Sequence, residues 1–82
     1  MERTLGGKTI LVTGAARGIG AQIARHFIRS GCSVYVTDID FEGARANAAE
    51  LGTAAIAIRM DVCNRPEVRA TIEQIVRERG PH

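Results

Sequence analysis

Three glycines stand close together near the start of the chain, directly after a short apolar run. The segment from Thr13 to Gly20 reads Thr-Gly-Ala-Ala-Arg-Gly-Ile-Gly and places glycines at 14, 18 and 20. Glycine adopts backbone conformations that other residues rarely adopt, so this segment can leave a strand sharply and start a helix within a few residues. The sequence therefore predicts a tight strand-to-helix turn beside the free N–H groups of a helix N-terminus.

Such a turn is suited to binding a phosphate group. A helix N-terminus presents unpaired N–H groups and the positive end of the helix dipole to an anion. Gly14 allows the sharp exit from the strand, Gly18 lets a pyrophosphate approach the backbone, and Gly20 lets the helix lie close to the sheet. The spacing G-x-x-x-G-x-G differs from the commoner G-x-G-x-x-G. Glycines also serve ordinary turns and close packing, so taken alone they leave both interpretations open.

Apolar runs and amphipathic segments alternate along the rest of the chain. The expected strands are 9–12, 33–37 and 54–60, and the expected helices are 18–30, 41–51 and one that follows Asn64. Strand 9–12 is apolar on both faces, as in a parallel sheet that is covered from both sides. Short connections and right-handed crossovers place the strands in the spatial order 3-2-1. The pattern predicts an α/β protein, the N-terminal βαβαβα half of a Rossmann-type doubly wound parallel sheet, ending before a fourth strand.

Each predicted helix carries apolar residues at helical spacing, and we expect these residues to face the sheet. The three stripes are Ile19, Ile23 and Phe27 with Ala24 and Ile28 beside them; Ala44, Ala48 and Leu51; and Val68, Ile72, Ile75 and Val76. Gly31, Gly52 and Gly80-Pro81 are expected to end the three helices. Asn64 and Glu67 have the spacing of a capping box at the start of the third.

Acidic residues follow two of the predicted strands. Asp38 ends the second strand, 18 residues after Gly20. A carboxylate at this place can accept hydrogen bonds from the ribose hydroxyls of an adenosine. Asp61, followed by Val62, ends the third strand and would flank the adenine. Each acid taken alone is also consistent with a turn residue or a helix cap, and the combination with the glycine turn favours nucleotide binding.

The composition argues against several other classes of protein. Eleven basic and nine acidic residues give a net charge of +2, with the arginines spread over helix faces among glutamates, so we expect no nucleic-acid binding. No apolar stretch approaches the ~20 residues that span a membrane. The N-terminus lacks the layout of a signal peptide, which favours a cytoplasmic location. The spacing of Cys32, Cys63 and His26 predicts no metal site.

Together these features resemble the short-chain dehydrogenase/reductase family. The resemblance rests on Thr13-Gly14-x-x-x-Gly18-Ile19-Gly20, the preceding Gly7-Lys8, Asp38 and Asp61-Val62, and it covers essentially the whole chain. Members of that family are NAD(P)(H)-dependent oxidoreductases that act on alcohols and carbonyls. The resemblance implies cofactor-binding roles for Gly14, Arg17, Gly18, Ile19 and Gly20 at the pyrophosphate and nearby ribose, for Asp38 and Ile39 at the adenosine ribose, and for Asp61 and Val62 at the adenine.

The signs of cofactor choice conflict. Asp38 would repel a 2′-phosphate, because two anions within hydrogen-bond range repel each other unless a cation lies between them. Arg17 is of a type found in family members that use NADP, but it is also open to interpretation as a surface arginine opposite Asp38 or Asp40. Ile39 offers no basic partner after Asp38. We expect NAD to be preferred, with NADP as the alternative.

No catalytic residue is expected in this chain. The resemblance implies a Tyr-x-x-x-Lys pair, a serine and an asparagine-rich turn, all later in the family's sequence. The only tyrosine here is Tyr35, with Ile39 four residues later, and the only lysine is Lys8. A phenol whose pKa is lowered by a lysine cannot be assembled from these residues, so the chain alone is predicted to be inactive.

We therefore expect residues 1–82 to be the dinucleotide-binding part of a single Rossmann domain, from an oxidoreductase that interconverts an alcohol and a carbonyl. The resemblance implies a small-molecule substrate of unspecified identity and a homo-oligomeric whole protein. One alternative is a non-catalytic nucleotide-binding module, in which a partner would cover the edge of strand 9–12. Another is an adenosylmethionine-dependent methyltransferase, against which the spacing of the glycines argues.

Overall fold

The computed structural model describes residues 8–79. Its elements follow the order β1 (Thr9–Val12), α1 (Gly18–Arg29), β2 (Ser33–Asp38), α2 (Phe41–Leu51), β3 (Ala55–Arg59) and α3 (Arg65–Arg79). The strands form one parallel sheet in the order β1-β2-β3, with Thr9 opposite Ser33 and Val34 opposite Ala55. Read from the other edge this order is 3-2-1, so the predicted Rossmann-type α/β sheet is confirmed.

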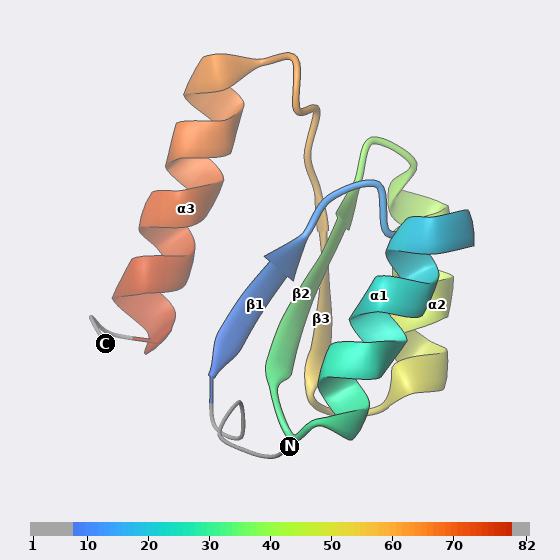
Figure 1. Ribbon diagram of the computed structural model, residues 1–82. Helices are drawn as coiled ribbons and strands as arrows, with labels where there is room; N and C mark the ends of the chain where they lie inside the picture. The colour runs from blue at the N-terminus through green and yellow to red at the C-terminus, as the bar shows by residue number, and fades with distance from the viewer. Residues whose placement is uncertain (1–7, 80–82) are drawn as a thin grey trace.

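Helices cover both faces of the sheet. Helices α1 and α2 lie together on one face, and α3 lies on the other side, next to β1 (Figure 1). Successive strand residues point to opposite faces, so Val34 and Val36 belong to the core under α1 and α2 while Tyr35 faces α3. The Tyr35 hydroxyl donates to Glu78 Oε1 at 2.8 Å. This bond ties the end of α3 to the middle strand.

The predicted inner face of α1 is confirmed in part. Ala24 is completely buried, whereas Ile19 and Ile23 are 77% and 43% exposed. Ala24, Phe27 and Ile28 of the predicted stripe pack on the core, so the prediction is wrong for Ile19 and Ile23 alone. Small residues at 20 and 24 let the helix axis approach the strands, and a branched side chain there would hold it away. In α2 the predicted burial of Ala44 and Ala48 is confirmed.

The predicted stripe of α3 is half right. Val68 and Ile75 are half-buried, but Ile72 and Val76 are each 48% exposed. Thr71 of this helix is buried, at 6% exposure. The inner face thus includes polar residues, which a search for apolar periodicity passes over.

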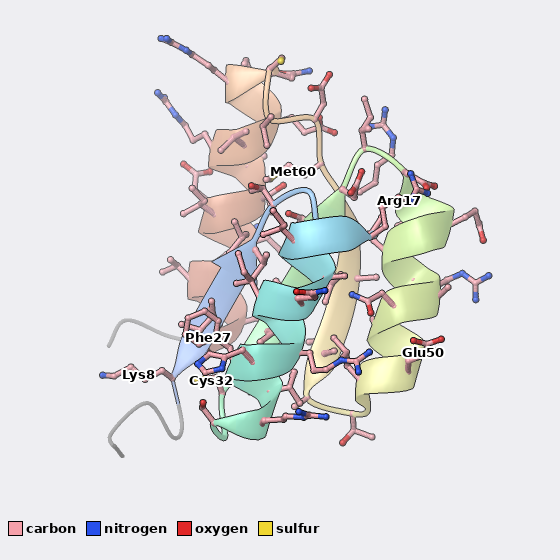
Figure 2. All side chains as sticks on the ribbon, turned by 45° about the vertical axis from the view of Figure 1, so that its right-hand side comes forward. Lys8, Arg17, Phe27, Cys32, Glu50 and Met60 are labelled. Carbon is pink, nitrogen blue, oxygen red and sulfur yellow. The ribbon has the colours of Figure 1, made fainter. Side chains whose placement is uncertain are left out.

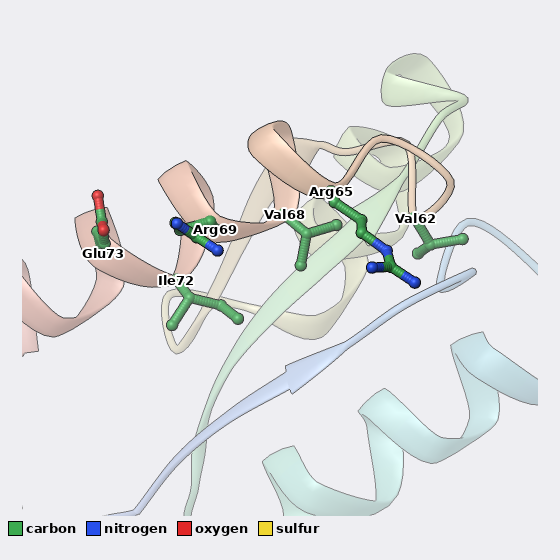
Figure 3. A pocket seen from close by; sticks show the side chains of 6 residues that line it. All are labelled: Val62, Arg65, Val68, Arg69, Ile72 and Glu73. Carbon is green, nitrogen blue, oxygen red and sulfur yellow. The ribbon is translucent and has the colours of Figure 1, made fainter.

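An open groove lies along α3, on the side toward β1 (Figure 3). Val62, Val68 and Ile72 supply its apolar wall, and its volume is about 350 Å³. The remaining lining residues are Arg65, Arg69 and Glu73. An exposed apolar surface of this kind is one against which further protein commonly packs.

The ends of the elements agree with the predicted bounds to within a residue or so. Strand β3 is one residue shorter at each end than expected. Asn64 Oδ1 accepts the Glu67 N–H at 3.1 Å, which confirms the predicted N-cap. The Glu67 carboxylate accepts the N–H of Asp61 at 3.0 Å, and not that of Asn64 as a capping box requires. Gly31 has the positive φ expected after α1, and Gly80-Pro81 lies outside the described residues.

Candidate functional site

The predicted site residues gather at the carboxyl edge of the sheet. The glycine turn connects β1 to α1, Asp38 ends β2, and Asp61 follows β3 (Figure 1). Because the three strands are parallel, their carboxyl ends meet at one edge. Open α/β sheets bind ligands outside this edge. The topology therefore brings together residues that lie far apart in the sequence.

The glycines of the turn have two distinct structural roles. Gly14 and Gly18 have φ angles of 61° and 66°, in the left-handed region that favours glycine. A Cβ at Gly18 would meet no heavy atom within 4 Å, so the space in front of this backbone is open. A Cβ at Gly20 would lie 2.1 Å from the carbonyl oxygen of Gly14. Gly20 is therefore needed for packing, whereas Gly18 borders space that a ligand can enter.

The N-terminus of α1 differs from those of the other two helices. Asp40 caps α2 by accepting the Gly43 N–H at 3.1 Å, and Asn64 caps α3 in the same way. At α1 the N-cap residue, Arg17, makes no side-chain cap hydrogen bond, and the first turn contains no acidic residue. The N–H groups of this first turn lie beside the open space at Gly18. Uncapped donors and a helix dipole at an open glycine turn suit a pyrophosphate.

Hydrogen bonds from β2 and α2 hold the turn in place. The Ala15 N–H donates to the carbonyl of Thr37 at 3.0 Å. The Thr37 hydroxyl donates to the carbonyl of Val12 at 2.8 Å, and the Asn47 amide donates to the carbonyl of Ala15 at 2.9 Å. The Ala16 N–H donates to Asp38 Oδ2 at 3.0 Å. The turn is thus fixed before any ligand arrives, which lowers the entropy cost of binding.

Asp38 organises the site as well as bordering it. Its Oδ1 accepts the Asp40 N–H at 3.0 Å, and its Oδ2 accepts the Ala16 N–H. The bond from Asp40 is the largest cause of a lowered Asp38 pKa; desolvation opposes the shift, and the Ala16 bond and the charge of Arg17 add to it. The group is therefore a carboxylate at neutral pH. Each oxygen keeps a lone pair with which it can accept a ribose hydroxyl.

Arg17 does not lie against Asp38. Its guanidinium forms an ion pair with Asp40 Oδ2, at the start of α2. Figure 2 shows Arg17 beside the N-terminal ends of α1 and α2. Of the two partners that the sequence left open, Asp40 is therefore the one with which Arg17 pairs.

The apolar site residues are exposed at the same edge. Ile19, Ile39 and Val62 all have more than half of their surface open to solvent. Asp61 Oδ1 accepts the N–H of Cys63 at 2.9 Å, which shapes the turn after β3. Exposed branched side chains around a carboxylate can flank a flat ring such as adenine.

Two residues of the site were missed in the sequence analysis. Asn47 is buried in the interior of α2 and bonds to the turn. Gly43 lets the turn approach α2, since a Cβ there would lie 2.9 Å from Cβ of Ala16. The one sequence signal for either is an unfavourable helix former inside a helix: glycine near its start and asparagine among alanines.

Replacing Asn47 with alanine is expected to destabilise the protein by about 1–3 kcal/mol, because it leaves the buried carbonyl of Ala15 without its donor. Glu50, exposed on the same helix, provides the control: Glu50→Ala should change stability by less than about 0.5 kcal/mol. Denaturant titration of both variants measures the difference. Equal midpoints for the two would show that the Asn47 bond does not hold the turn.

The arrangement can bind an anionic nucleotide, but the tyrosine of the chain takes no part in it. Tyr35 is completely buried on the α3 face, with its hydroxyl bonded to Glu78, and not at the carboxyl edge. Among residues 8–79 no three His, Cys, Asp or Glu side chains lie together as metal ligands would. In the same range no helix is long and apolar enough to cross a membrane.

Comparison with known proteins agrees with this geometry. The family model described as short chain dehydrogenase matches residues 8–81. Sorbitol dehydrogenase of Cereibacter sphaeroides is 44% identical over 72 residues, which are 88% of this chain and 28% of that protein. L-fucose dehydrogenase of Oryctolagus cuniculus is 49% identical over 74 residues, which are 90% of this chain and 26% of that protein.

A solved structure shows the same fold. The 3-ketoacyl-(acyl-carrier-protein) reductase from Brucella melitensis, complexed with NADH, superposes with a TM-score of 0.87 at 36% identity, over 94% of this chain and 32% of that one. The chain thus spans about a quarter to a third of the length of these relatives. With the family model matching nearly its whole length, the chain belongs to the short-chain dehydrogenase family.

Proposed function

We propose that this chain is the cofactor-binding part of an NAD(P)-dependent oxidoreductase that interconverts an alcohol and a carbonyl. The observation that carries the proposal is the uncapped N-terminus of α1 beside the open backbone of Gly18, with the Asp38 carboxylate at the same edge. The pyrophosphate would lie at the helix N-terminus, and the adenosine ribose at Asp38. When bound, the nicotinamide supplies the hydride chemistry, and these residues bind and orient its adenosine diphosphate half.

The relatives support this class of reaction. Two are named for the dehydrogenation of a polyol or a sugar, and a third is a reductase complexed with NADH. Because the names of these relatives give different substrates, we propose a small alcohol or carbonyl as the substrate class. The open groove along α3, next to β1, supports packing against additional chain of the kind these longer relatives contain.

The proposal includes a preference for NAD. Asp38 is held as a carboxylate by two backbone N–H groups, and a 2′-phosphate on the ribose would meet its charge. Arg17, the basic residue that could offset this repulsion, is paired with Asp40. The cytoplasmic location and the homo-oligomeric state expected from the sequence stay predictions.

The test compares the 82 residues with the full-length protein that carries them. The full-length protein is expected to bind NADH, which the change in NADH fluorescence measures. It is also expected to reduce NAD when a polyol or sugar alcohol is supplied as the substrate. Adenosylmethionine should not displace NADH. The 82 residues alone should show no reduction of NAD above background, because they contain no general acid–base pair. Turnover by the short chain that disappears in Tyr35→Phe would contradict the assignment of roles, and a full-length protein without affinity for NADH would overturn the function.

A further inference from the structure

Asp40 makes two separate interactions at the ribose side of the candidate site. Its Oδ1 accepts the Gly43 N–H at 3.1 Å and so caps α2. Its Oδ2 forms the ion pair with Arg17. Its own N–H donates to Asp38 Oδ1 at 3.0 Å, which places it next to the carboxylate expected to meet the ribose. The two acids and the arginine therefore form one charged cluster between the glycine turn and α2.

The ion pair with Asp40 holds the guanidinium of Arg17, the positive charge of the turn, at the start of α2. Arg17 immediately precedes Gly18 in the turn, and its side chain is mostly exposed. A guanidinium in this place can bind a phosphate monoester through two parallel N–H donors. Pairing with Asp40 occupies one terminal nitrogen of that fork and offsets its charge with the carboxylate. A phosphate on the 2′-oxygen of the ribose would then face two carboxylates, Asp38 and Asp40. The Arg17 guanidinium would offset their charge only in part, because it is already paired with Asp40.

We propose that Asp40 is a specificity-determining residue that disfavours 2′-phosphorylated cofactors by holding Arg17 in an ion pair. This inference rests on the proposed function, since it assigns the discrimination between NAD and NADP at the same site. It differs from the repulsion by Asp38, because Asp40 acts on the cation of the turn. Removing the Asp40 charge frees Arg17 while leaving Asp38 in place.

The rival explanation is that Asp40 serves only as a helix cap. Asparagine caps helices about as well as aspartate, so Asp40→Asn preserves the bond to Gly43 and removes the charge. Glu42 supplies the matched control. It lies two residues away, pairs with Arg45 at 2.9 Å, and loses the same single charge in Glu42→Gln.

The experiment measures dissociation constants of NADH and NADPH for the full-length protein, in the parent sequence and in the variants. An exposed ion pair typically changes an equilibrium by a factor of about two to five. Asp40→Asn is therefore expected to raise the NADPH-to-NADH affinity ratio about fivefold, mainly by tightening NADPH. Glu42→Gln should change the ratio by less than about twofold, since its partner lies outside the cluster. In an Arg17→Ala background most of the gain from Asp40→Asn should disappear.

Three results would overturn the inference. The ratio could stay unchanged in Asp40→Asn; it could rise equally in Glu42→Gln; or it could rise equally with and without Arg17. Any of these results would mean that Asp40 only caps α2 or only adds to the negative charge around the site, and does not act through Arg17. A parent protein that binds neither dinucleotide would instead refute the proposed function, and the inference with it.

Discussion

Gly20→Ala is expected to destabilise the protein by about 3 kcal/mol, the upper end of the usual cost of overpacking. A methyl group there would lie 2.1 Å from the carbonyl oxygen of Gly14 and 2.8 Å from its carbonyl carbon. Both contacts are with backbone, so no side chain can rotate away, and α1 or the turn must move. Alanine would gain about 1 kcal/mol of helix propensity over glycine, which is too little to compensate.

Gly18→Ala is the matched comparison for this prediction. Its Cβ would meet no atom within 4 Å, and its cost comes from the positive φ alone, about 1–2 kcal/mol. Urea titration should therefore show a clearly smaller free energy of unfolding for Gly20→Ala than for Gly18→Ala. Gly18→Ala should also lower the affinity for NADH while the fold persists, because the added methyl group enters the space in front of the turn. If Gly20→Ala were as stable as the parent, the close approach of α1 to the turn would be wrong.

The architecture of the protein could be predicted from its sequence, but part of the packing of α1 could not. Glycine spacing and the alternation of apolar runs were enough to predict the order of elements, the parallel sheet and the edge of the sheet at which the candidate site residues gather. They placed Gly20, Ala24, Phe27 and Ile28 on the inner side of α1 correctly, but they placed Ile19 and Ile23 there as well. The larger Ile19 and Ile23 dominate the pattern and lie to the side.

Polar contacts between elements could not be predicted from the sequence for a different reason. Asn47 lies 32 residues from the carbonyl that it binds, and Arg17 lies 23 residues from Asp40. Such pairs depend on how α2 sits against the turn, which periodicity within one helix does not specify. Asp38 was predicted from its place after β2, but its bond to the Ala16 N–H required the folded turn.

Asp38→Ala is expected to lower the affinity for NAD about 10–100-fold, because each charge-assisted hydrogen bond to a ribose hydroxyl is worth ~1.5–3 kcal/mol. The affinity for NADP should fall much less or improve, since the variant also removes the repulsion of a 2′-phosphate. The structure adds a second consequence that both cofactors share. The Ala16 and Asp40 N–H groups lose their acceptor, so the turn loosens and some affinity for either dinucleotide is lost. The ratio of the two affinities is therefore the quantity that isolates the ribose contact.

Two further variants separate the charge of Asp38 from its support of the turn. Asp38→Asn keeps one acceptor oxygen for the backbone and removes the charge, so it should shift the ratio toward NADP with a smaller loss of stability than Asp38→Ala. Asn47→Ala loosens the same turn from the α2 side without touching the ribose, so it should weaken both cofactors by the same factor. Titration of NADH and NADPH into the three full-length variants measures all of these changes. If Asp38→Asn and Asn47→Ala both left the ratio unaltered, Asp38 would be a residue that only shapes the turn, and the preference for NAD would have to come from elsewhere in the protein.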